Sequence, residues 1–116
     1  MVIPQIETAE GLANVDAIAA VAGVDALWLG HFDLSNFLGI PGQFEHPTFV
    51  AAAERIVAAS AAHGKTAAFL ATDDDWARDY AAKGFRLLAY GIDSLMLQGA
   101  LAHGLAVIRK ARTRNG

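Results

Sequence analysis

Cysteine is absent from this sequence of 116 residues, and so are runs of lysine or arginine. Without cysteine there is no disulfide and no thiolate metal site. Nine basic residues against twelve acidic ones give a net charge of -3 at pH 7, which leaves no positively charged surface of the kind that nucleic acid requires. No apolar stretch approaches the about 20 residues of a membrane span, and the residues that follow Met1 lead us to expect no signal peptide. We therefore expect a soluble, cytoplasmic protein that binds neither nucleic acid nor membrane.

What the sequence does contain is a short apolar strand followed by a helix, four times over. The strands are predicted at residues 2–6, 25–29, 67–71 and 86–90, and the helices at about 8–23, 47–63, 72–84 and 94–112. Successive strand-helix units imply a parallel sheet with right-handed crossovers. Without a linker or a change in composition, residues 1–116 form one α/β domain. Four units make either half of an eight-fold barrel or a small open sheet.

Two carboxylates follow the first two strands. Glu7 ends the first strand and Asp33 follows the second, so both are expected at the carboxyl edge of the sheet, where parallel α/β proteins bind ligands. A hard cation such as Mg²⁺ typically takes one or two carboxylates and keeps water in its other positions. The alternative is local: Glu7 can cap the next helix, and Asp33 can form a helix N-cap or a turn.

Two other segments stand out. Residues 30–46 form a connection longer than usual, which we expect to be an irregular binding loop. The helix at 94–112 is apolar over much of its circumference, which is typical of a helix buried on two sides. We expect one side to pack on the strands and the other to meet a partner. Trp28, Trp76 and Tyr80 are interpreted as core or interface aromatics, and His31 as a residue with a hydrogen bond in the loop.

Several motifs together resemble the HpcH/HpaI aldolase/citrate lyase family. They are Pro4-Gln5-Ile6-Glu7-Thr8, the segment from Gly23 to Ser35 that ends in Gly30-His31-Phe32-Asp33-Leu34-Ser35, His46-Pro47, Gly64-Lys65 and Gly91-Ile92-Asp93. The two acids stand 26 residues apart, which agrees with the family. The resemblance covers nearly the whole chain and implies the C-terminal half of a TIM (β/α)8 barrel. Within the family, the sequence is most similar to class II pyruvate aldolases.

That resemblance implies a site and a reaction. Glu7 and Asp33 would hold Mg²⁺, Mn²⁺ or Co²⁺, which stabilises the charge that forms when a 4-hydroxy-2-oxo acid is cleaved to pyruvate and an aldehyde. The backbone N–H groups of Gly30 and Phe32 would bind the substrate carboxylate, and the side chains of Leu70 and Ile92 would line the site.

The same resemblance implies what this chain does not supply. The family's catalytic arginine and its His-Asp base lie on earlier strands, so no catalytic residue is identified here and activity of this chain alone should be weak or missing. In the family, the last helix packs on a neighbouring subunit, which predicts a homo-oligomer. Two hypotheses remain: the metal-binding half of a carbon–carbon lyase, or a catalytically inactive half-barrel assembly module that associates through strand edges and the last helix.

Overall fold

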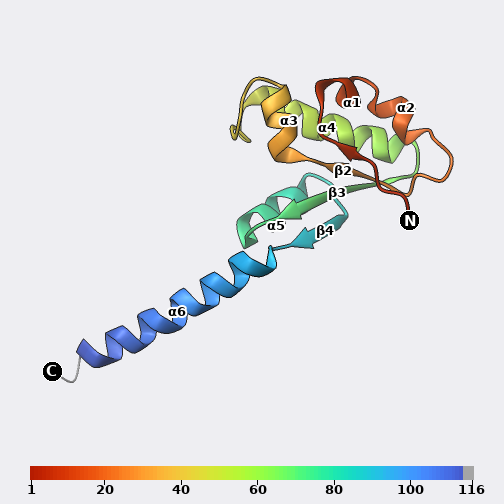
Figure 1. Cartoon of the computed structure of the whole chain (residues 1–116). Coiled ribbons are helices and arrows are strands. Elements are labelled where there is room, and N and C mark those ends of the chain that lie inside the picture. Colours follow the sequence, from red (N-terminus) through yellow and green to blue (C-terminus); the bar gives the residue numbers. More distant parts are fainter. Residues whose placement is uncertain (114–116) are drawn as a thin grey trace.

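Four parallel strands form one sheet in the order in which they occur in the chain (Figure 1). The computed structural model describes residues 1–113, and its strands are β1 (Gln5–Ile6), β2 (Ala26–Leu29), β3 (Thr66–Ala71) and β4 (Leu87–Tyr90). Each strand pairs in parallel with the next, and Gln5 lies opposite Trp28, which lies opposite Ala68. The predicted strands and their parallel arrangement are confirmed. Within residues 1–113, the outer edges of β1 and β4 have no strand partner.

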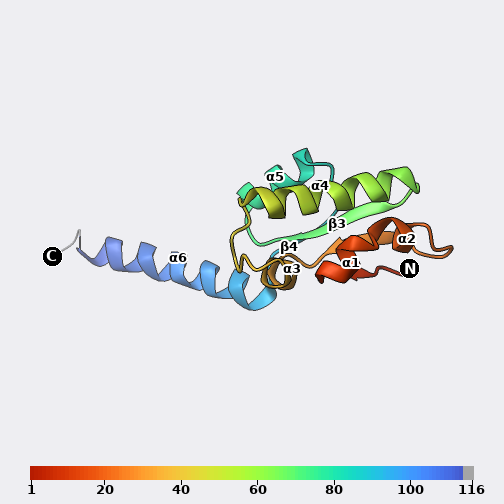
Figure 2. The same ribbon diagram turned by 90° about the horizontal axis from the view of Figure 1, so that it is seen from above.

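Helices follow each strand. They are α1 (Ala9–Ala13), α2 (Val15–Ala19), α3 (His31–Phe37), α4 (Pro47–Ala62), α5 (Asp74–Ala82) and α6 (Asp93–Thr113). Of these, α4 and α5 pack on one face of the sheet. In the view from above, α4 lies along β3, with α5 beside it (Figure 2). Within the described part of the chain, no helix is long and apolar enough to cross a membrane.

The two faces of the sheet differ in burial. Side chains alternate along a strand, and on β2 Leu27 and Leu29 are buried completely while Trp28 between them is only half-buried. The core therefore lies between the sheet and its helices, where Phe69 stacks on Tyr80 with ring centroids 3.6 Å apart. The other face carries Gln5, Trp28 and Leu70 toward a cavity.

Three helices begin as the sequence predicts. The Thr8 hydroxyl accepts a hydrogen bond from the Gly11 N–H at 2.9 Å, and the Asp73 carboxylate accepts one from the Trp76 N–H at 2.9 Å. His46 caps α4, its Nδ1 accepting from the Thr48 N–H at 3.2 Å. Each cap satisfies a donor that has no partner inside the helix.

The connection after β2 is not irregular throughout, so that prediction needs correction. After Gly30, the next seven residues form α3, which buries His31, Leu34 and Ser35. Positions i, i+3 and i+4 lie on one face of a helix, so burying these three residues accounts for the helix. The predicted first helix also differs, because it divides at Asn14 into α1 and α2.

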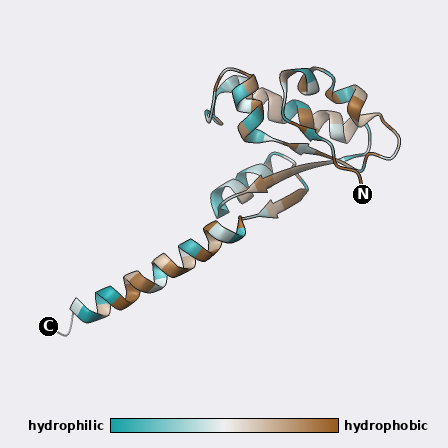
Figure 3. Cartoon of the chain, in the orientation of Figure 1, coloured by the Kyte–Doolittle hydropathy of each residue, from teal (hydrophilic) through white to brown (hydrophobic). Residues whose placement is uncertain are grey.

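The last helix contradicts the prediction that one of its sides packs on the strands. None of the 21 residues of α6 is buried, and the helix extends away from the sheet (Figure 1). Figure 3 shows apolar residues along its length, and seven large ones are exposed: Leu95, Met96, Leu97, Leu101, Leu105, Val107 and Ile108. The radius of gyration is 18.3 Å, whereas a compact domain of this size has about 13 Å. The extended helix accounts for the difference.

Candidate functional site

A cavity of about 220 Å³ opens at the carboxyl ends of β2 and β3. It is lined by Gln5, Trp28, Gly30, His31, Phe32, Asp33 and Leu70. Four of the six predicted site residues are thus brought together, because α3 carries the residues that follow β2 and β3 carries Leu70. Ile92 is not among the lining residues; it is 41% exposed in the connection between β4 and α6.

Glu7 reaches this region by packing against Gly30. A Cβ atom added to Gly30 would stand 2.7 Å from the Glu7 Cβ and 2.7 Å from the Gln5 Nε2, closer than real Cβ contacts allow. The Gln5 side chain donates a hydrogen bond to the Glu7 carboxylate at 2.6 Å. The absence of a side chain at Gly30 therefore leaves the space in which Gln5 and Glu7 lie.

The backbone of Gly30 has a different role from the one predicted. Its N–H donates to the Ile6 carbonyl at 3.0 Å and so continues the β1–β2 ladder. Because that donor is already used, the prediction that it binds a substrate carboxylate needs correction. The N–H of Phe32 lies in the first turn of α3, where backbone donors have no partner within the helix.

Asp33 lies on α3 and is exposed, whereas its neighbour His31 is buried. The His31 ring has four aromatic neighbours, with centroids 4.5 Å away at Phe32, 5.0 Å at Phe69, 5.2 Å at Trp76 and 5.4 Å at Phe44. Within the described residues its Nε2 has no hydrogen-bond partner. Burial lowers the pKa of His31, and nearby Asp33 and a hydrogen bond with the Leu29 backbone oppose that shift. The histidine has the hydrogen bond that the sequence predicts, with the Leu29 backbone, but it lies on α3 within an aromatic cluster and not in a loop.

Sequence reasoning did not assign three of the lining residues to the site: Gln5, Trp28 and His31. Gln5 orients Glu7, and Trp28, interpreted from the sequence as a core or interface aromatic, lines the cavity wall. The signal was available: Trp28 alternates with Leu27 and Leu29, so it must point to the opposite face. Gln5 pairs with Trp28 across the strands and therefore shares that face.

The donor set fits a cation that keeps part of its water shell. No group of three or more His, Cys, Asp or Glu side chains able to hold a metal occurs within residues 1–113. Glu7 follows β1 and Asp33 lies in the first turn of α3 after β2, so two carboxylates come from neighbouring βα connections, and Gln5 bonds to one of them. Mg²⁺ and Mn²⁺ accept such oxygen ligands, and Mg²⁺ usually retains several waters.

Comparison with known proteins places this chain in a family. The model of the HpcH/HpaI aldolase/citrate lyase family matches residues 1–100. The chain belongs to this family. It is 42% identical over 97 residues to a hydroxypyruvate/pyruvate aldolase of Pseudomonas aeruginosa, covering 84% of this chain and 36% of that protein. A 2-keto-3-deoxy-L-rhamnonate aldolase of Klebsiella pneumoniae is 36% identical over 105 residues, covering 90% of this chain and 39% of the relative.

Solved structures of the family share the fold. A family protein from Burkholderia cenocepacia superposes with a TM-score of 0.88 at 36% identity, over 92% of this chain and 42% of that one. The chain therefore forms four βα units of the TIM-barrel fold of its family, which confirms the predicted fold class. It spans about two fifths of the length of the curated relatives described above. Those relatives are named as a hydroxypyruvate/pyruvate aldolase and a 2-keto-3-deoxy-L-rhamnonate aldolase.

Proposed function

We propose that this chain supplies the metal-binding half of a class II pyruvate aldolase, a lyase that cleaves 4-hydroxy-2-oxo acids to pyruvate and an aldehyde. One observation carries the proposal: Asp33, Phe32 and Leu70 line a single cavity, and Glu7 packs against Gly30 at its edge. In a TIM barrel, this carboxyl edge is where active sites lie. The aldolase names of the relatives favour the same chemistry.

Each residue has a role in this proposal. Gln5 fixes the orientation of the Glu7 carboxylate through their hydrogen bond. The Phe32 N–H would donate to the carboxylate of a 2-oxo acid, while Trp28 and Leu70 exclude water from one side of the cavity. Glu7 and Asp33 would hold Mg²⁺, Mn²⁺ or Co²⁺. When bound there, the cation supplies a Lewis acid that draws electron density from the keto oxygen of the substrate.

The test is Mn²⁺ titration of the 116-residue chain by calorimetry, with Asp33→Ala as the variant. Because Asp33 is a proposed ligand, its removal should abolish Mn²⁺ affinity. Because its side chain is exposed, the circular dichroism spectrum should stay unchanged. Glu10→Ala removes another exposed acid, on α1 outside the cavity, and should leave Mn²⁺ binding as it is. Equal Mn²⁺ affinity in the wild-type chain and Asp33→Ala would refute the site assignment.

A pyruvate-release assay on the same chain, with Mn²⁺ and a 4-hydroxy-2-oxo acid, addresses turnover. Because the family's arginine and His-Asp base are expected on strands outside this chain, we expect metal and pyruvate binding without turnover. Robust release of pyruvate would show that a base and an oxyanion stabiliser act within these 116 residues, and the division of roles proposed here would be wrong.

A specific observation favours a second candidate, a half-barrel assembly module without turnover. The seven exposed apolar side chains of α6 and the free edges of β1 and β4 are surfaces that proteins normally cover. We propose that the chain is a homo-oligomer. Its solution mass, measured by light scattering across a range of concentrations, should be a multiple of 12.2 kDa. A mass of one chain at every concentration would refute association.

A further inference from the structure

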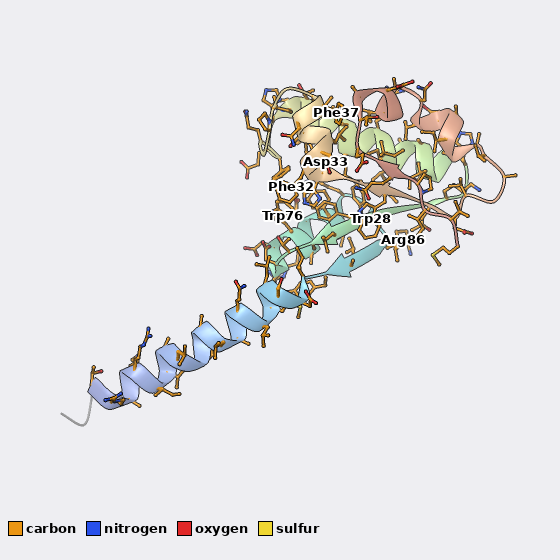
Figure 4. All side chains as sticks on the ribbon, in the orientation of Figure 1. Trp28, Phe32, Asp33, Phe37, Trp76 and Arg86 are labelled. Carbon is orange, nitrogen blue, oxygen red and sulfur yellow. The ribbon has the colours of Figure 1, made fainter. Side chains whose placement is uncertain are left out.

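An exposed aromatic ring stands at the rim of the cavity. Phe32 is 57% exposed, although phenylalanine is among the residues most often buried, and it lines the same cavity as Asp33. Figure 4 shows Phe32 and Asp33 at the same end of α3, with Phe37 at the other end of the helix. An exposed ring beside a candidate metal ligand raises the question of what covers it.

The wall to which Phe32 belongs is mostly apolar. Trp28 and Leu70 line the cavity with it, and both are half-buried and still accessible. Polar lining comes from Gln5, Asp33 and the buried His31, and Gln5 already bonds to Glu7. The accessible apolar part of the wall is therefore formed by the indole of Trp28, the phenyl ring of Phe32 and the side chain of Leu70.

Contacts within the chain restrict the position of Phe32. It packs edge-on against Phe44 with centroids 5.2 Å apart, and its own backbone carbonyl accepts a hydrogen bond from the Ser35 hydroxyl at 2.7 Å. That hydroxyl also accepts from the Gly42 N–H at 3.0 Å, which ties α3 to the following loop. A ring fixed in this way loses little conformational entropy when a ligand packs on it.

We infer that Phe32 selects the substituent of the substrate, and that this site prefers 2-oxo acids carrying an aryl or bulky apolar group at carbon 4. The aldehyde released from such a substrate is apolar rather than a polyhydroxylated sugar fragment. A sugar hydroxyl placed against this wall loses hydrogen bonds to water and finds apolar carbon in their place. This inference rests on the proposed function, because it takes the carboxylates and the Phe32 N–H as the place where the 2-oxo acid end binds.

The test compares two unreactive acids that differ only by a phenyl ring, 2-oxo-4-phenylbutanoate and 2-oxobutanoate. Their dissociation constants are measured by calorimetry on the 116-residue chain saturated with Mn²⁺. The wild-type chain should bind the phenyl acid about tenfold more tightly, as one favourable aromatic contact and its buried area predict. In Phe32→Ala the ratio of the two constants should fall to below about threefold, because only the phenyl acid loses the aromatic contact.

Phe37→Ala provides the matched control. Phe37 is 61% exposed and belongs to the same helix, but it does not line the cavity. Its removal should leave the ratio at the wild-type value. A wild-type ratio near one, or a ratio that Phe32→Ala leaves unchanged, would overturn the inference while the proposed function stands. Failure of the wild-type chain to bind either acid with Mn²⁺ would overturn the proposed function and the inference with it.

Discussion

Replacing Gly30 by alanine should damage the candidate site directly. The backbone at Gly30 has φ -83° and ψ 76°, so alanine is not excluded by its φ, and the effect comes from the added methyl group. That methyl would stand 2.7 Å from both the Glu7 Cβ and the Gln5 Nε2. The Glu7 contact is close to the backbone, so Glu7 cannot avoid it by rotating a distant end of its side chain. Overpacking of this kind costs about 1–3 kcal/mol.

Two measurements follow from that magnitude. Thermal unfolding should show a lower Tm for Gly30→Ala, by roughly 4–8 °C for each kcal/mol in a domain near this size. Calorimetry should show Mn²⁺ affinity reduced by about tenfold or more, because a displaced Glu7 loses its bond with Gln5. Gly99→Ala on α6 is the control, since a Cβ there meets no atom within 4 Å. Unchanged Tm and Mn²⁺ affinity in Gly30→Ala would refute the packing argument.

Two further predictions concern His31 and Ser35, two buried residues of α3. The pKa of His31 in the folded chain lies below its ordinary value. As the pH falls, the unfolded chain therefore binds a proton at His31 before the folded chain does. The free energy of unfolding should decrease below about pH 6.5. Urea unfolding at pH 7.5 and 5.5 should show a smaller pH dependence in His31→Phe, and an equal dependence would contradict this. Ser35→Ala removes two hydrogen bonds, one to the Phe32 carbonyl and one from the Gly42 N–H, and should cost about 1–3 kcal/mol, whereas Ser60→Ala removes only the bond to the Ile56 carbonyl and should cost less. Equal losses of unfolding free energy for the two serine variants would refute that distinction.

The regular elements could be predicted because their signals are local. Helix starts depend on a cap within a few residues, as at Thr8 and Asp73, and parallel strands depend on short apolar runs. The α3 helix was missed because glycine and aromatic residues suggested a loop, although His31 and Leu34 already had helical spacing. The engagement of the Gly30 N–H by Ile6 could not be predicted, because it depends on the pairing of two strands.

Residues of the candidate site were predicted largely through family resemblance. Asp33 and Leu70 share a cavity as expected, whereas Trp28 and Gln5 were recognised only when the sheet showed which face they occupy. The position of α6 could not be derived either. Its apolar side chains indicate that α6 is buried against something. The pattern on one helix does not show whether the strands of the same chain or another surface bury it.

The helical content of the exposed α6 should depend on the concentration of the protein. Most of the stability of a helix in a protein comes from packing, and isolated helices are marginal in water. Gly99 and Gly104 each lower helix propensity by about 1 kcal/mol relative to alanine. With no buried residue to hold it, α6 in a dilute single chain should fray, and it should become ordered when a surface covers Leu101 and Leu105. Its helical signal in circular dichroism would then report association, so that folding of this segment and binding are one equilibrium.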